Sequence, residues 1–348
     1  WKTFLRNPLS LGFNDALINY DNSRFSGQHL PNGINAWERR KAHDYQDLIE
    51  ESISSQDDMN TVATLINIIL PICGLDFIKK YDLVTSVIHT PDDYRELTYA
   101  YLKECAANNV IYVEAMISST HAKLKGMTYD SFLEGIYDAS QQAEKDFNII
   151  SRFIMNGIRH LGPDSVQSTA EEVLNKPHPY LVGFGLAGDE LHFPPNLFSK
   201  TFDMLKEAKF PITIHAGEWD GPENIRNALN LLHPSRLGHG VRSIEDPNLV
   251  KEIIERDIVL ETCPTSNIAT KIYKSYEAHP VKKLFDAGVK ITVNSDDPPF
   301  FNASIAGEYE VMSNLGLSKK ELISLTRNVI ESSFCDQSTK EKLLFKLD

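Results

Sequence analysis

The chain has 348 residues, of which 42% are hydrophobic, so it is long enough for one large α/β domain or two ordinary ones. Its net charge of −13 argues against binding to DNA or RNA, because neutralising phosphates requires clustered Lys and Arg. No run approaches the roughly 20 apolar residues of a membrane span, and no signal peptide is visible. The four cysteines show no CxxC spacing, which favours a reducing, cytoplasmic compartment.

The N-terminal segment differs in character from the rest of the chain. Residues 7–31 are rich in Asn, Ser, Gly and Asp and are typical of loops, residues 35–52 predict a charged helix, and residues 59–70 predict an apolar one. Residue 1 is Trp rather than Met, so we expect the natural start to lie upstream. We predict a helical and loop segment over 1–75, either an insertion or a rebuilt first strand–helix unit, and a barrel over 76–348.

From about residue 75, amphipathic helices alternate with short β-branched runs. The predicted strands are 109–116, 148–156, 180–188, 211–217, 236–240, 257–264 and 290–297. Alternation of strands with helices implies parallel units, and seven of them predict a (β/α)8 TIM barrel whose first strand is unclear or upstream. An open doubly wound sheet is the alternative, but it would more often carry a glycine-rich phosphate loop after its first strand, and no G-x-G-x-x-G or Walker motif follows the first predicted strand at 109–116.

Three of the predicted strands end in His or acidic residues. His215 and Glu218 follow one apolar run, His239 ends the next, and Asp296 with Asp297 closes the last. A single His at a strand end is more often structural, and adjacent aspartates often cap a helix. Because a barrel builds its active site at the C-terminal ends of its strands, however, this repetition predicts an enzyme. Adjacent residues of a strand point to opposite sides, so the two aspartates are expected to have different roles.

These motifs, in this order, resemble the adenosine deaminase family of the amidohydrolase superfamily. The motifs are HAGE (215–218), GHG (238–240), CPTSN (263–267) and NSDDP (294–298), joined by VGFGLAGDE (182–190) and FIKKYDLVTSVIHTPDDY (77–94). The resemblance runs from about Leu75 to the C-terminus. It implies a zinc-containing (β/α)8 barrel, in agreement with the strand count above.

The resemblance assigns the hydrolytic half of the site. His215 and Asp296 would ligate Zn²⁺, and His239 would orient the attacking water and help to deprotonate it. Zinc lowers the pKa of bound water to about 7, which makes hydroxide available at neutral pH. The other zinc-deaminase signature, H-x-E with P-C-x-x-C, is absent. We therefore expect Cys263 in the barrel core and Ser266 with Asn267 in loop structure.

The resemblance also implies a purine substrate. Glu218 would donate a proton to purine N1, Asp297 would hydrogen-bond N7, and the backbone N–H of Gly188 would meet N3. Phe77 and Tyr81 would line an apolar lid. Because an aromatic purine resists attack at C6 unless N1 is protonated, Glu218 needs a raised pKa, which burial supplies.

The sequence departs from the family pattern at the first strand. The family carries an H-x-H pair there that supplies two further zinc ligands, and this sequence has no H-x-H. Only GQHLPNG (27–33) resembles it, and His29 is expected to be an exposed loop residue. A catalytic zinc site normally has three protein ligands and one water molecule. Either the pair lies upstream of Trp1, or the metal site is altered, or the chain is a relic that binds without catalysis.

A second departure lies in VEAMISS (113–119), where relatives often carry an Arg, so Glu114 has no evident partner. The sequence as a whole predicts zinc-dependent deamination of adenosine, or of a close adenine derivative, to the 6-oxo purine plus ammonia. The alternative is a metal-poor, inactive family member that binds purine nucleosides without turnover. An amidohydrolase acting on a simple amide is disfavoured, because Glu218 and Asp297 serve ring nitrogens that an amide lacks.

Overall fold

The computed structural model describes residues 76–85 and 88–347. The chain divides into two compact units, one of residues 1–71 with 79–87 and one of residues 72–78 with 88–348. The second, here called the barrel unit, contains every described strand. Helix α5 (Asp76–Thr85) begins in the barrel unit and ends in the other. The helices expected over 35–52 and 59–70, and the expected loop with His29, lie outside the described residues.

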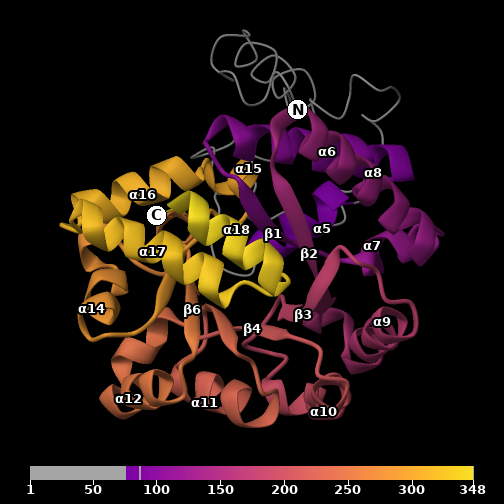
Figure 1. Cartoon of the computed structure of the whole chain (residues 1–348). Coiled ribbons are helices and arrows are strands. Elements are labelled where there is room, and N and C mark those ends of the chain that lie inside the picture. Colours follow the sequence, from indigo (N-terminus) through magenta and orange to yellow (C-terminus); the bar gives the residue numbers. More distant parts are fainter. Residues whose placement is uncertain (1–75, 86–87, 348) are drawn as a thin grey trace, which may run out of the picture. The chain divides into compact units, whose positions relative to one another are not determined.

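The barrel unit is built on a curled sheet of seven parallel strands in chain order, which confirms the TIM-barrel fold class (Figure 1). The strands are β1 (Tyr112–Ile117), β2 (Ile150–Ile158), β3 (Leu181–Ala187), β4 (Ile212–Ala216), β5 (Arg236–His239), β6 (Val259–Thr262) and β7 (Ile291–Val293). Each strand pairs in parallel with the next in sequence. The position of every predicted strand is therefore occupied by an observed one, while the expected first strand lies outside the described residues.

Helices connect the strands and surround the sheet (Figure 1). They are α6 (Pro91–Ala107), α7 (Ser119–Leu124), α8 (Tyr129–Phe147), α9 (Pro163–Asn175), α10 (Ser199–Glu207), α11 (Pro222–Leu231), α12 (Pro247–Glu255), α13 (Pro264–Ala269), α14 (Val281–Asp286), α15 (Pro298–Phe301), α16 (Ile305–Asn314), α17 (Lys319–Ser332) and α18 (Gln337–Leu347). No helix within the described ranges is both long and apolar enough to span a membrane.

Two local expectations differ from the structure at the end of the barrel that carries the motifs. The last strand, expected to run to residue 297, ends at Val293, so Asp296 and Asp297 lie in the loop before α15. CPTSN was expected to hold loop structure at Ser266 and Asn267, but Pro264 begins α13, because proline suits the first turn of a helix. Both residues are therefore held on a helix.

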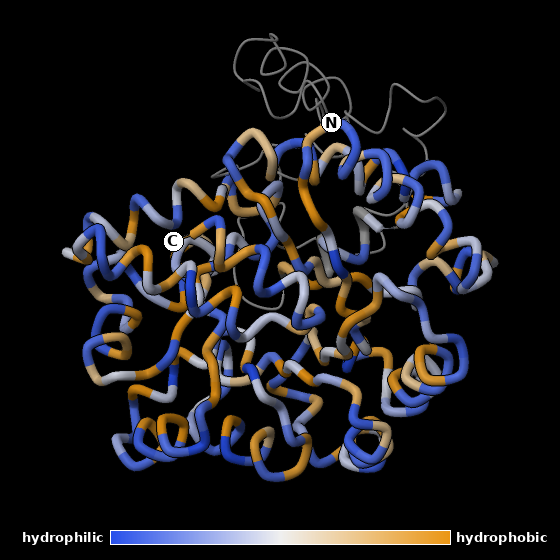
Figure 2. Tube along the Cα trace, viewed as in Figure 1, coloured by the Kyte–Doolittle hydropathy of each residue, from blue (hydrophilic) through white to orange (hydrophobic). Residues whose placement is uncertain are grey.

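The strands are apolar runs because both faces of a parallel sheet are covered. Leu186, Ile214, Leu237 and Leu260 are fully buried in the main core cluster. Hydrophobic positions concentrate on the strands and on the inner turns of the surrounding helices, while hydrophilic positions lie outside (Figure 2). This packing fixes the strand ends from which the polar side chains project.

A buried polar network links side chains from β1, β4, β5 and β6. Arg236 of β5 contacts Glu114 of β1 at 2.7 Å and Glu261 of β6 at 2.8 Å. Thr213 of β4 donates to Glu261 at 2.7 Å, and the Arg236 guanidinium lies 3.5 Å from the ring centre of Phe334. The partner that the sequence did not show for Glu114 is thus Arg236, which lies far from it in sequence.

Candidate active site

Two residues at the strand ends hold a backbone conformation that side chains rarely adopt. His239, the last residue of β5, has φ of 60°, and Asp296, beyond β7, has φ of 55°. Left-handed geometry at a residue other than glycine costs about 1 kcal/mol or more, and such positions cluster at active sites. The surrounding fold maintains this geometry at both residues that the sequence singled out.

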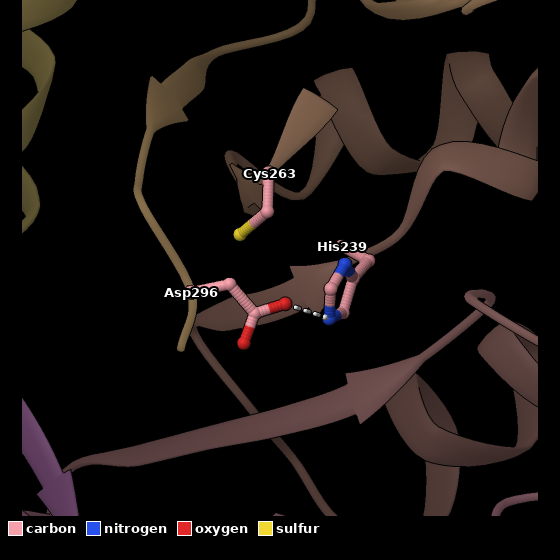
Figure 3. Close-up of side chains that lie close together, drawn as sticks. All are labelled: His239, Cys263 and Asp296. Carbon is pink, nitrogen blue, oxygen red and sulfur yellow. Dashed lines mark ion pairs between the residues drawn. The ribbon is translucent and has the colours of Figure 1, made fainter. Parts of the chain in front are cut away.

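Three strand ends bring a His and two carboxylates together. Nε2 of His239 lies 3.4 Å from Oε2 of Glu218 and 3.8 Å from Oδ2 of Asp296. The side chains are mostly buried, with exposed fractions of 3%, 12% and 18% respectively. Figure 3 shows the Asp296 carboxylate directed at the His239 ring, with the sulfur of Cys263 beside them.

His215 lies against the backbone of the neighbouring strand. Its ring centre is 5.3 Å from that of His239, and a Cβ added at Gly238 would lie 2.9 Å from its Nδ1. Glycine at 238 is therefore what lets the ring lie flat on β5. Burial, with His239 nearby, lowers the pKa of His215 to about 3, so the ring is neutral and keeps a lone pair for a ligand.

The donor atoms fit part of a zinc shell. Neutral imidazole and carboxylate are ordinary zinc ligands, and buried Nδ1 of His215 has no hydrogen-bond partner among the described residues. Possible ligand atoms of three side chains also lie within 4.8 Å of one another, one each from His239, Cys263 and Asp296. Cys263 was expected only in the core; it is buried, but its sulfur faces this cluster, and burial raises the pKa of its thiol well above the usual range.

The acidic residues of the site hold their protons more strongly than usual. Burial, with Asp296 and Glu190 nearby, raises the pKa of Glu218 well above the usual range. Burial and the neighbouring Asp296 raise the pKa of Asp297 to about 8. Both groups are therefore available at neutral pH as hydrogen-bond donors, the form in which a carboxyl group can serve a ring nitrogen.

A buried carboxylate that the sequence reading left unassigned shapes the loop that carries Glu218. Glu190, only 1% exposed, accepts hydrogen bonds from the backbone N–H groups of Gly217 at 2.9 Å, of Trp219, and of Asp220 at 2.7 Å. The loop after β4 thus folds around one side chain. Charge-assisted bonds of this kind are about twice as strong as neutral ones, so Glu190 fixes where Glu218 points.

Arg159 is a second functional residue that the sequence reading missed. It is fully buried and donates from Nη2 to the carbonyl oxygen of His215 at 2.6 Å. Burial lowers its pKa to about 10, against the opposing attraction of Glu190. The sequence holds one signal for Arg159, because it directly follows the largely apolar run 153–158. A charged residue is almost never fully buried unless it is paired, so an arginine at this position indicates a specific partner.

The remaining expected residues lie as follows. Gly188 comes directly after β3 with φ of 103°, and a Cβ there would lie 2.6 Å from Nδ1 of His160, so only glycine suits the position. Phe77 packs against the rings of Phe300 and Phe301 at 5.4 Å and 5.0 Å. Tyr81 lies further along α5, among residues of the other unit.

Comparison with known proteins agrees with this geometry. A family model described as adenosine deaminase matches residues 53–348. The chain is 43% identical to an adenine deaminase of Sinorhizobium medicae (strain WSM419) over 272 residues, which is 78% of this chain and 84% of the relative. In structure it resembles an adenine deaminase from Arthrobacter aurescens with a TM-score of 0.77, at 26% identity, over 87% of this chain and 93% of that one.

A second solved structure, an amidohydrolase from Burkholderia ambifaria with bound Zn, superposes with a TM-score of 0.75 at 25% identity. It covers 86% of this chain and 87% of that one. The matched segments include every motif on which the resemblance was based, since residues 53–348 contain them all. The chain therefore belongs to the adenosine deaminase family and is an aminohydrolase.

Proposed function

We propose that the protein hydrolyses adenine, or a close adenine derivative, to the 6-oxo purine and ammonia. The observation that carries the proposal is the position of His239, whose Nε2 faces both Glu218 and Asp296 at 3.4 Å and 3.8 Å. The similarity to relatives called adenine deaminase, at 40% to 43% identity, favours the free base over the nucleoside. In the balanced reaction, water oxygen bonds to C6, the bond from C6 to the amino nitrogen breaks, and ammonia leaves.

His215 and Asp296 are the residues that would hold a divalent cation, which we propose to be Zn²⁺. When bound, zinc would supply Lewis-acid activation of water at neutral pH. Two protein ligands fall short of the three that a zinc site normally has, so at least one further ligand is required. The expected first strand, which supplies these ligands in the family pattern, lies outside the described residues.

The carboxyl groups serve the purine ring. Glu218, held by the loop around Glu190, would give its proton to N1, which makes C6 electrophilic. Asp297, protonated at neutral pH, would donate to N7, and the backbone N–H of Gly188 would meet N3. His239 would orient the attacking water between Glu218 and Asp296. Phe77, packed on α15, would cover the ring.

Ammonia release from purified protein tests the proposal. Adenine, adenosine and 2′-deoxyadenosine are supplied separately, with zinc added, and ammonia is measured over time. We expect release from adenine, with Glu218→Gln reducing kcat by about 100-fold or more, because an amide has no proton for N1. Glu310→Gln, an exposed carboxylate on α16, is the matched control and should remain active.

Two outcomes contradict the proposal in different ways. Ammonia from adenosine but not from adenine would overturn the choice of substrate. No ammonia from any of the three purines, with thermal stabilisation by adenine and no bound metal, would instead support the inactive binder. Metal analysis separates the cases, because the enzyme should hold about one zinc per chain.

A further inference from the structure

A row of buried polar groups extends from His239 away from the site. Nδ1 of His239 lies 3.2 Å from Nδ2 of Asn267, and Oδ1 of Asn267 lies 3.0 Å from Nε2 of His279. The backbone N–H of Val281 lies 3.2 Å from Nδ1 of His279. The three residues His239, Asn267 and His279 are buried, with exposed fractions of the whole residue of 2%, 0% and 2% in that order. We call these four groups the relay.

The direction of every hydrogen bond in the relay follows from its far end. A backbone N–H can only donate, so Nδ1 of His279 accepts from Val281, and neutral His279 carries its proton on Nε2. That proton is donated to Oδ1 of Asn267, which turns the amide nitrogen toward His239. The amide nitrogen also can only donate, so Nδ1 of His239 is an acceptor and is bare.

We propose that Asn267 and His279 are positioning residues that fix His239 in the tautomer with its proton on Nε2. The relay leaves Nδ1 no other role than acceptor, and a neutral imidazole has one protonated nitrogen. His239 therefore presents an N–H, and not a lone pair, toward carboxyl oxygens of Glu218 and Asp296. This part of the inference depends on geometry alone and holds whether or not the protein is a deaminase.

The elements that hold the relay are themselves fixed by hydrogen bonds. The backbone carbonyl of Asn267 accepts from the N–H groups of Ile272 at 3.0 Å and of Tyr273 at 3.2 Å. Buried Glu308 accepts from the N–H of Thr265 at 3.1 Å, at the first turn of α13. The ring of His279 packs edge-on against Tyr273 at 4.8 Å between ring centres. Asn267 thus has little freedom to rotate away.

The consequence for catalysis rests on the proposed function. An imidazole nitrogen that already bears a proton has no lone pair, so Nε2 of His239 neither takes a proton from water nor binds a metal. It can only donate, which suits a residue that orients the attacking oxygen and stabilises its charge. His239 thus orients the water and leaves its deprotonation to another group.

Nuclear magnetic resonance of the full-length protein tests the tautomer directly. In protein labelled with 15N-histidine, protonated and bare ring nitrogens give widely separated 15N shifts, and the His239 signals are those missing from His239→Gln. We expect a protonated Nε2 and a bare Nδ1. A protonated Nδ1 with a bare Nε2, or two protonated nitrogens at neutral pH, would overturn the inference.

Asn267→Asp inverts the relay with almost no change of shape. A carboxylate can only accept, so His239 should move its proton to Nδ1 and expose a lone pair at Nε2. We expect the 15N signals of His239 to exchange character and kcat to fall about 10³- to 10⁴-fold with a small change in KM, the size of effect that a wrong tautomer has in serine proteases. An unchanged tautomer in this variant contradicts the inference.

A second pair of variants covers the case in which Asn267→Asp does not fold. His279→Gln keeps a donor for Oδ1 of Asn267, whereas His279→Leu removes it and lets the amide turn over. The first should keep the Nε2–H signal of His239 and the second should show a mixture of tautomers. Equal spectra for the two variants would contradict the inference. Because these readouts are spectroscopic, a protein without deaminase activity that shows the expected tautomer would overturn only the proposed function.

Discussion

Nη2 of Arg159 donates a 2.6 Å hydrogen bond to the carbonyl oxygen of His215, while Arg159 also attracts Glu190, which holds the loop of Glu218. A buried cation and a buried anion thus hold the two chain segments that flank the end of β4. We expect Glu190→Gln to lower kcat about 10- to 100-fold, because a shift of about 1 Å in a catalytic group has an effect of this size.

The same pair makes a prediction about stability. Arg159 and Glu190 are opposite charges that influence one another in the interior, and removing one of two such charges leaves the other uncompensated, at about 3–5 kcal/mol of unfolding free energy. We expect a loss of this size in the free energy of unfolding for Arg159→Met and for Glu190→Gln. The double variant should lose clearly less than the sum of the two single losses. Urea unfolding of the four proteins measures this coupling. Additive losses would mean that the two charges do not stabilise one another.

The network at Arg236 should behave differently from the site. Arg236→Met leaves Glu114 and Glu261 buried without a cation, so we expect a loss of about 3–5 kcal/mol in the free energy of unfolding. The folded variant, assayed at low temperature, should keep its kcat. The side chains of Arg236, Glu114 and Glu261 do not contact the strand-end cluster, by which we mean His215, Glu218, His239 and Asp296. A large fall in kcat without a loss of stability would contradict the structural role assigned to Arg236.

The pH dependence of stability should contain a contribution from Glu308. Burial raises the pKa of this carboxyl to about 7 from 4.5. The folded state therefore keeps a proton that the unfolded chain has lost, and the resulting stability is full below pH 4.5 and is lost as pH rises through about 7. Between pH 4.5 and about pH 7, the free energy of unfolding of the unmodified protein should fall by about 3 kcal/mol relative to that of Glu308→Gln.

The control for Glu308 lies on the same helix. Glu310 is exposed, so Glu310→Gln should follow the unmodified protein at every pH. Urea unfolding at a series of pH values measures the three curves. If Glu308→Gln and Glu310→Gln gave parallel curves, the raised pKa of Glu308 would not contribute to stability.

Gly238 provides a steric test of the His215 position. A Cβ at 238 would lie 2.9 Å from Nδ1 of His215, so Gly238→Ala should displace the ring, reduce bound zinc, and lower activity about 100-fold. Gly221→Ala is the matched control, because its nearest neighbour is an Arg242 nitrogen 4.0 Å away. Metal content by mass spectrometry distinguishes the two. Equal zinc in both variants would argue against His215 as a ligand.

The sequence was sufficient to predict the seven strands and the end of the barrel at which the polar groups gather. Each strand is a buried apolar run that stops at a polar residue, so His215 and His239 were visible from local pattern alone. The end of β7 was misplaced by a few residues, since the apolar run stops at Val293 and the loop that follows has no period of its own.

The supporting residues could not be predicted, because their contacts are set by the fold. Asn267 lies 28 positions from His239 along the chain, and Glu190 lies 30 positions from Asp220. No spacing rule links such pairs, and each residue taken alone is typical of a loop. Likewise the partner of Glu114 is Arg236, 122 positions away along the chain.

The central claim is that the strand-end cluster of His215, Glu218, His239 and Asp296 catalyses hydrolytic deamination of an adenine-type purine. The most direct measurement is ammonia release from adenine by the full-length protein supplied with zinc, beside Glu218→Gln and the control Glu310→Gln. The account predicts steady release by the unmodified protein and the control, and a loss of about 100-fold or more in Glu218→Gln. Equal release by all three, or no release from any adenine-type purine by zinc-loaded protein, would contradict it.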